Sequence, residues 1–242
     1  AYDADGNDLN AQSNSSFYLL YSRLGIDMTG PSIGKIATSA KIETDFRGTG
    51  TSFAILRIRH AYVNLAWKQS ALLLGQTWHP FFGDIYPQVL NLNTGAPFNA
   101  FSRAPQIRYR FDNGHWQLTG AALWQLQYLS NGPNGKSEEY IKNSCIPEFY
   151  AGIDYKHENF QSGIGAEVLS LKPRTQNTVD GKVYKLDERI TSMSFEAHLR
   201  YKTPDWLVAA KSTLGENLTH TCMLGGYGVT SIYDRTGEQT YT

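Results

Sequence analysis

Residues 190–202 read ITSMSFEAHLRYK and alternate apolar and polar side chains without a break. One set comprises Met193, Phe195, Ala197, Leu199 and Tyr201, and the other comprises Ser192, Ser194, Glu196, His198, Arg200 and Lys202. A period of two places the two sets on opposite faces of a β-strand. The stretch therefore predicts a long amphipathic strand with one apolar face and one face in water.

The same alternation returns along the chain and marks about eleven candidate strands. They are 16–28, 34–46, 54–67, 70–78, 106–111, 115–128, 149–157, 160–171, 190–202, 206–214 and 223–234. Several are longer than the roughly five or six residues usual in globular proteins and reach the 9 to 11 or so that a membrane-spanning strand needs. Charged residues interrupt every apolar run before the roughly 20 residues of a helical span. We predict an all-β protein, a transmembrane antiparallel β-barrel that forms a single domain over residues 1–242.

The composition fits this fold and excludes some partners. Fifteen Tyr, 11 Phe and 5 Trp suit a barrel with aromatic girdles at the membrane interfaces. Lys plus Arg equals Asp plus Glu at 22 each, so no net charge attracts nucleic acid, and we expect no nucleic-acid partner. Cys145 and Cys222 match no zinc or redox spacing, and we expect them to be unpaired.

Connections between the candidate strands differ sharply in length. Lys68–Gln69 and Glu158–Asn159 are tight turns, whereas 130–147 and 172–189 are long and polar. Short turns on one rim and long loops on the other are typical of outer-membrane barrels.

The most informative loop runs over residues 83–105, GDIYPQVLNLNTGAPFNAFSRAP. It is too long and too apolar for an ordinary solvated loop, and we expect it to fold into the lumen and narrow a pore. An extracellular or subunit-contacting loop is the alternative.

Arginines alternate with apolar residues on both sides of this loop. The candidate pore-lining and solute-binding residues are Arg57, Arg59, Arg103, Arg108 and Arg110 on the wall, with Asp84, Asn91, Asn93 and Asn99 on the loop. If the strands are neighbours, the guanidinium groups form a cationic strip that attracts carboxylates or phosphates. The alternative is that they pair with Glu43, Asp45 or Asp84 and hold the loop, and both can be true.

The stretch LRIRHAYVNLAWKQSALLLGQTWHPFFGD at 56–84, followed by RAPQIRYRF at 103–111, resembles porins of the Bacteroidetes outer membrane and the related dicarboxylate-channel type. The resemblance implies a homotrimer of barrels of about sixteen strands in the outer membrane of a Gram-negative bacterium. It further implies passive transport of ions and small hydrophilic, often anionic, solutes, with outer-membrane lipid and lipopolysaccharide as surroundings.

The chain departs from that pattern in its length and its end. It has 242 residues and ends in GEQTYT instead of an aromatic-terminated strand, and about eleven strands is not the even number of a bacterial barrel. We therefore expect a C-terminally incomplete sequence, or one that lacks some segments. A switch of face near His60 also predicts a β-bulge.

Enzyme signatures are missing from the sequence. It has no G-x-S-x-G, H-E-x-x-H, Walker or paired-cysteine motif, and its six histidines lack metal spacing. We expect no catalytic residue, no metal and no cofactor. A Ser194–His198 pair in a barrel wall is the enzymatic alternative that the sequence leaves open. A soluble or surface β-sandwich that binds carbohydrate is the alternative fold and function, since its strands also alternate.

Overall fold

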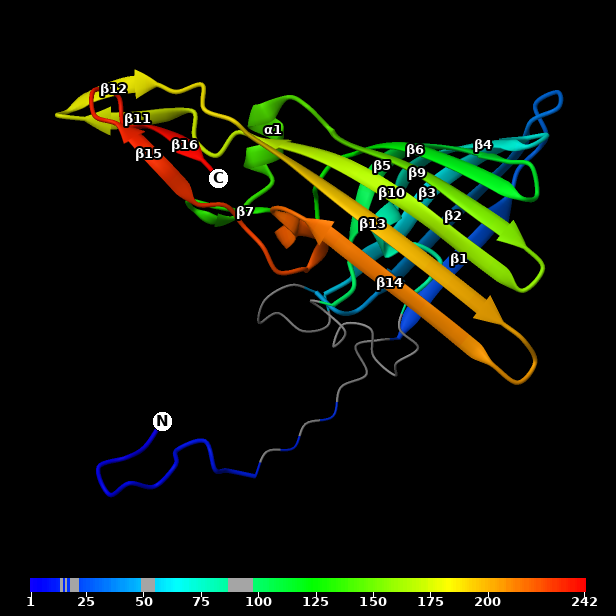
Figure 1. Ribbon diagram of the computed structural model, residues 1–242, viewed down its shortest axis with the longest axis horizontal. Coiled ribbons are helices and arrows are strands. Elements are labelled where there is room, and N and C mark those ends of the chain that lie inside the picture. Colours follow the sequence, from blue (N-terminus) through cyan, green and yellow to red (C-terminus); the bar gives the residue numbers. More distant parts are fainter. Residues whose placement is uncertain (14, 16, 18–21, 49–54, 87–97) are drawn as a thin grey trace.

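The computed structural model describes residues 1–13, 15, 17, 22–48, 55–86 and 98–242. Ten strands form one sheet in which every pair of neighbours is antiparallel (Figure 1). In sheet order they are β1 (Arg23–Thr29), β2 (Ala37–Asp45), β3 (Arg57–Trp67), β4 (Ser70–Trp78), β5 (Arg103–Asp112), β6 (Trp116–Leu123), β9 (Glu148–His157), β10 (Phe160–Leu171), β13 (Ile190–Lys202) and β14 (Leu207–Gly215). The predicted all-β, antiparallel fold is confirmed.

The sheet curls but is not closed. Figure 1 shows the ten strands wrapping around a concave side, with β1 and β14 at the two edges. Within the described residues these two edge strands are not paired with each other. A barrel of about sixteen strands stays a prediction.

Smaller elements gather beyond one end of the sheet (Figure 1). They are the hairpins β7 (Asn131–Gly132) with β8 (Gly135–Lys136), β11 (Gln176–Val179) with β12 (Lys182–Lys185) and β15 (Val229–Tyr233) with β16 (Glu238–Tyr241), and the helix α1 (Glu139–Ser144). The expectation that 223–234 is a further barrel strand is wrong, because β15 pairs with β16 outside the large sheet. No helix among the described residues has the length and apolar character needed to cross a membrane.

Turns and loops alternate between the two ends of the sheet, as predicted. Lys68 and Gln69 alone separate β3 from β4, and Glu158 and Asn159 alone separate β9 from β10. The connections 79–102, 124–147 and 172–189 all leave from the opposite end. One rim is therefore tight, and the other carries the long segments and the small elements.

The burial pattern is the reverse of that in a soluble protein. Along β13, Phe195 is 47% exposed whereas Glu196 is 4% exposed, and the alternation continues on both sides of this pair. Lys211 lies opposite His198 in the β13–β14 register, so the two share a face. The Lys211 Nζ donates to the Phe82 carbonyl oxygen at 3.0 Å, which places this polar face on the inner side. An apolar face turned outward contradicts the β-sandwich alternative, in which it would be the core.

A bulge interrupts the β2–β3 ladder where the sequence predicts one. His60 lies opposite Glu43 and Ile58 lies opposite Thr44, so Arg59 is an extra residue on β3. As a result both Arg59 and His60 are buried, although they are consecutive. The bulge turns two neighbouring polar side chains to the inner side.

Candidate functional site

Polar side chains from six segments surround a hollow of about 380 Å³ on the inner side of the sheet. The charged residues of this inner hollow are Asp84, Arg108, Arg110, Asp154, Glu196 and His198, and the aromatic ones include Trp78, Phe82, Tyr86 and Tyr150. Strand alternation explains part of the selection, because the residues from β5, β9 and β13 stand on the polar faces of their strands, whereas Phe82, Asp84 and Tyr86 come from the connection after β4. The hollow can hold a small hydrophilic molecule or several waters.

The segment after β4 crosses the concave side and contacts the opposite wall. The Phe81 ring packs edge-on against Tyr150 of β9 with centroids 5.7 Å apart. At the far edge, Lys211 of β14 donates to the carbonyl oxygens of Phe81 and Phe82. The Phe101 amide, near the end of the same connection, donates to the Thr221 carbonyl oxygen at 2.7 Å. The connection therefore turns to the inner side at Phe81 and Phe82, whereas Phe98 is 88% exposed.

Arg57 and Arg59 are engaged by acidic residues of β2. Arg57 donates from Nε and Nη2 to the two carboxylate oxygens of Asp45, at 2.9 and 2.6 Å. Arg59 donates to Glu43 at 2.6 Å and to Asp45 at 3.2 Å. This arrangement is the pairing that the sequence raised as the alternative to a free cationic strip. Paired and bidentate guanidinium groups offer little charge to a passing anion.

Arg103 is buried among aromatic rings at the start of β5. Its guanidinium carbon lies 4.8 Å from the Trp78 ring centroid, and its Nη2 donates to the Tyr128 hydroxyl at 3.1 Å. The side chain is 1% exposed. Cation–π contact stabilises a guanidinium group in such a place, so Arg103 holds the base of the connection and does not line the inner hollow.

Arg108 and Arg110 are the two predicted arginines that line the inner hollow. Arg108 donates from Nε to Gln106 at 2.7 Å and from Nη2 to the Trp78 carbonyl oxygen. Among the described residues, no carboxylate lies within ion-pairing distance of either arginine, so their charge faces the space.

The predicted loop residues are only partly placed. Asp84 is exposed at the hollow, and its carboxylate is 3.8 Å from the Lys156 ammonium. Asn99 is buried, and its Nδ2 donates to the Ala100 carbonyl oxygen at 2.9 Å. Asn91 and Asn93 lie outside the described residues.

Asp154, Glu196 and His198, which the sequence analysis did not single out as site residues, line the inner hollow together with the two arginines. His198 lies between Asp154 and Glu196, with its Nε2 2.9 Å from Asp154 and its Nδ1 3.1 Å from Glu196. The alternation of β9 and β13 already puts all three on polar faces, but only the β9–β10–β13 order brings them together. The inner hollow therefore has both signs of charge. Ser194 donates instead to the Glu216 carbonyl oxygen at 3.4 Å, so a Ser194–His198 pair is not formed.

A second group of polar residues lies on the inner side, nearer the end of the sheet that carries the long loops. His79, Glu148, Glu167 and His220 are all buried, and one ligand atom from each lies within 4.8 Å of the others. No sequence pattern points to this group, because the four residues come from distant segments with no shared spacing. We call these four residues the His–Glu cluster.

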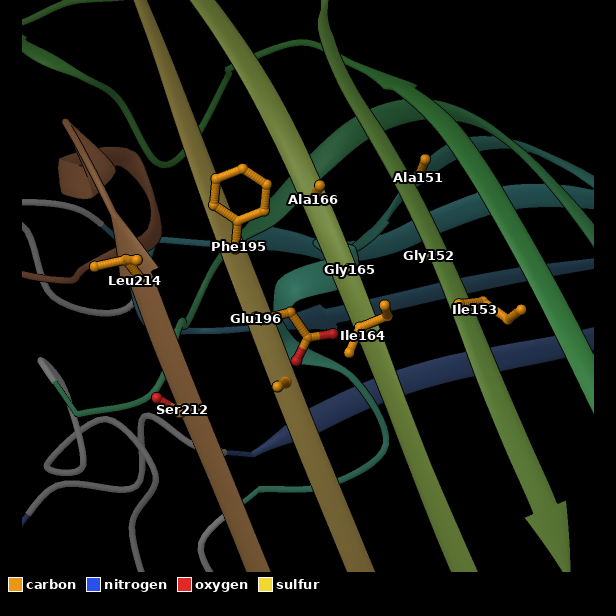
Figure 2. Close-up of a pocket in the computed structure, with 11 residues that line it drawn as sticks. Ala151, Gly152, Ile153, Ile164, Gly165, Ala166, Phe195, Glu196, Ser212 and Leu214 are labelled. Atoms are coloured by element: carbon orange, nitrogen blue, oxygen red, sulfur yellow. The ribbon is translucent and has the colours of Figure 1, made fainter.

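A different hollow, of about 630 Å³, lies on the outer side across β9, β10, β13 and β14 (Figure 2). Its outward side chains are small or apolar, among them Ala151, Ile164, Ala166, Phe195 and Leu214. Tyr150 covers Gly152 and Gly165 from the inner side: a Cβ on either glycine would come within 2.5 Å of the Tyr150 hydroxyl. The outer hollow lacks the convergent polar groups of a solute site and suits acyl chains or another apolar surface.

Comparisons with known proteins identify the fold but not a family. No family model matches the chain, and no curated protein matches it. Among solved structures, a loop-deletion mutant of OmpT, an outer membrane protein of Vibrio cholerae, superposes with a TM-score of 0.53 at 14% identity, over 81% of this chain and 61% of that one. In-vitro folded OmpT of the same organism gives 0.50 at 13% identity, over 80% and 55%.

The match is to the architecture alone. A mutant of Rh. blastica porin gives a TM-score of 0.38 at 12% identity, over 79% of this chain and 73% of that one, which is too weak to carry weight. This chain spans 61% and 55% of the lengths of the two OmpT structures. The fold is that of outer-membrane β-barrels, which supports the predicted outer-membrane location.

Proposed function

We propose that this chain is a pore of the outer membrane of a Gram-negative bacterium, through which small hydrophilic solutes and ions pass by passive diffusion. The observation that carries the proposal is the reversed burial of the ten-stranded sheet, with Glu196 covered and Phe195 exposed on the same strand. An outward apolar face is stable in lipid, and an inward polar face is stable against water. No chemical step is involved, so the proposed protein is not an enzyme.

The tight rim has the aromatic side chains that a membrane interface favours. Trp67 lies 6.3 Å from Tyr109, and Trp116 lies 4.9 Å from Tyr155, measured between ring centroids. Tyr201 continues this set on β13, opposite Phe160 of β10 in the strand register. Such a girdle fixes the depth of a barrel in the bilayer. Outer-membrane lipid and lipopolysaccharide are the proposed surroundings.

The proposal includes a preference of the pore for anions, which rests on Arg108 and Arg110. Three of the five predicted arginines are engaged by carboxylates or aromatic rings. The remaining two line the inner hollow together with Asp154 and Glu196. A carboxylate or phosphate can exchange water for brief contacts with the guanidinium groups and then leave, because weak binding permits passage.

The family and assembly are proposed on the sequence resemblance. A porin of the Bacteroidetes or dicarboxylate-channel type would be a homotrimer whose connection over 83–105 narrows each pore. The inward course of Phe81, Phe82 and Phe101 supports that role for the connection.

Reversal potentials in planar bilayers test the anion preference. Under a KCl gradient, the wild type should favour chloride, and R108Q/R110Q should lower the anion-to-cation permeability ratio by at least about fivefold, since even one unit charge at about 4 Å in water is worth about 1 kcal/mol. K182Q/K185Q is the matched control, because both lysines are exposed on β12, away from the inner hollow. Equal ratios in R108Q/R110Q and the control contradict the anion preference.

A further inference from the structure

The His–Glu cluster joins four segments at one buried point. Glu148 opens β9, Glu167 stands on β10, His79 follows β4 and His220 belongs to the 3₁₀ turn Leu218–Thr221. Each of the four residues is 1% exposed. Two carboxylates are thus buried side by side, and among the described residues no lysine or arginine is paired with either. Buried charges of one sign are costly unless an opposite charge compensates them.

Hydrogen bonding distinguishes His79 from the other residues of the His–Glu cluster. The Phe81 amide donates to His79 Nδ1 at 3.2 Å, so Nε2 carries the ring proton and donates to Glu148 Oε1. Both ring nitrogens of His79 therefore have hydrogen-bond partners, and His79 fixes the position of one oxygen of Glu148.

The other ligand atoms are left open. Both oxygens of Glu167 and both ring nitrogens of His220 lack hydrogen-bond partners in the described structure. His220 Nε2 lies 3.1 Å from Glu148 Oε2, but the two groups do not have hydrogen-bond alignment. Unpartnered buried groups that converge on one point are the arrangement expected around an ion.

We propose that Glu148, Glu167 and His220 bind a divalent transition-metal ion of the zinc class, and that His79 is a positioning residue that orients Glu148. Two carboxylates balance a charge of 2+. A mixed set of imidazole nitrogen and carboxylate oxygen favours zinc and its neighbours over magnesium and calcium, which prefer oxygen ligands alone.

The spacing fits such an ion. Ligand atoms at about 2.1 Å from a tetrahedral zinc ion are about 3.4 Å apart, and they can be no more than about 4.2 Å apart in any geometry. The 3.1 Å between His220 and Glu148 is close to the first value. The limit of 4.8 Å holds for one atom from each of the four residues, His79 included, so the three ligands need at most a small inward movement of a side chain. The ion would tie the connection after β4 and the turn at 218–221 to the wall strands.

Zinc titration of the full chain tests the site. The protein is folded in detergent micelles without metal, and Zn²⁺ binding is followed by calorimetry together with elemental analysis. We expect one zinc ion per chain that excess Mg²⁺ or Ca²⁺ does not displace. E167Q should weaken zinc binding by more than about 100-fold, and H79Q by about 10- to 100-fold, the range for residues that orient a ligand.

The control is H157Q, at the tight rim, where His115 and His157 stack 5.5 Å apart and offer the competing surface site. This variant should bind zinc as the wild type does. Wild-type protein that binds no zinc, or equal affinities for wild type and E167Q, overturns the proposal. So does loss of binding in H157Q. If E167Q does not fold, X-ray absorption of the zinc-loaded wild type decides: one imidazole with oxygen ligands supports the site, and several imidazoles or a sulfur ligand contradict it.

Discussion

Gly75 on β4 occupies a position that no larger residue fits. Its φ is +132°, and a Cβ would lie 2.2 Å from the Ala61 carbonyl oxygen and 2.7 Å from the Tyr62 Cα on β3. Both contacts are with backbone, which cannot swing away. Gly75→Ala should therefore lower the free energy of unfolding by about 3 kcal/mol, measured by urea titration in detergent micelles.

Gly120 on β6 provides the matched position for that measurement. A Cβ added there meets open space, so Gly120→Ala should change the free energy of unfolding by less than about 0.5 kcal/mol. Equal losses in the two variants would show that the strand contact at Gly75 is not as close as described.

Glu188 links the β11–β12 hairpin to the β15–β16 hairpin, and we expect this link to depend on pH. Arg174 binds both its oxygens at 2.7 and 2.9 Å, and Tyr241 and the Gln239 amide donate at 2.6 and 2.7 Å. Burial alone would raise the pKa of Glu188, but these hydrogen bonds outweigh it and hold the pKa below 4.5. A lowered folded pKa means that the carboxylate contributes stability above the unfolded pKa near 4.5 and loses it as pH falls through the folded pKa.

Hydrogen exchange of the Gln239 amide reads out this effect. Its protection factor should be constant from pH 7 to about 5 and then fall about tenfold, because a hydrogen bond to a charged group contributes about 1.5 kcal/mol. E188Q should show the low protection already at pH 7. Amides of the β9–β10 ladder are the internal reference, and a parallel fall there would point to general unfolding.

Sequence alternation correctly put the arginines and their acidic partners on one face, but it could not assign contacts across that face. Arg57 reaches Asp45 because β2 and β3 are neighbours in this register. His79 meets Glu148 only because the connection after β4 turns inward. Contacts of the second kind depend on a loop path, which no local pattern encodes.

The orientation of β10 gives a prediction at the level of the strand. Ile164 is 61% exposed on its outer face, and Ile232 is 57% exposed on β15, outside the large sheet. In lipid, Ile164→Arg should cost about 2–4 kcal/mol of folding free energy near the bilayer midplane. Ile232→Arg should cost little, because its side chain stays in water. Denaturant titration of the two variants in lipid vesicles makes the comparison, and equal small effects would argue against a lipid-facing β10.

The best-predicted elements are those with long unbroken alternation. Residues 160–171 and 190–202 become β10 and β13 with the predicted bounds. The strand predicted over 115–128 ends early, at Leu123, since its next partner is Pro105, which has no amide proton to continue the ladder. Alternation continues past that point, so the sequence pattern alone could not locate the end.

At the scale of the whole molecule, the alternation of short turns and long connections predicts an antiparallel sheet with two unlike rims, and the structure has both. Strand number and closure were not predictable in the same way. They depend on the pairing of the edge strands β1 and β14, which is not made within the described residues. The curl itself is stabilised from inside, where Lys211 of β14 holds the segment that follows β4.

Single-channel recording in planar bilayers tests the central claim, that the polar inner face encloses water in a membrane. Folded full-length protein added to one side should give discrete, long-lived conductance steps that persist without any energy source. Arg110→Trp, which fills part of the inner hollow, should reduce the step size, while Ile232→Trp on β15 should leave it unchanged. Membrane-inserted, folded protein that never conducts would contradict the account.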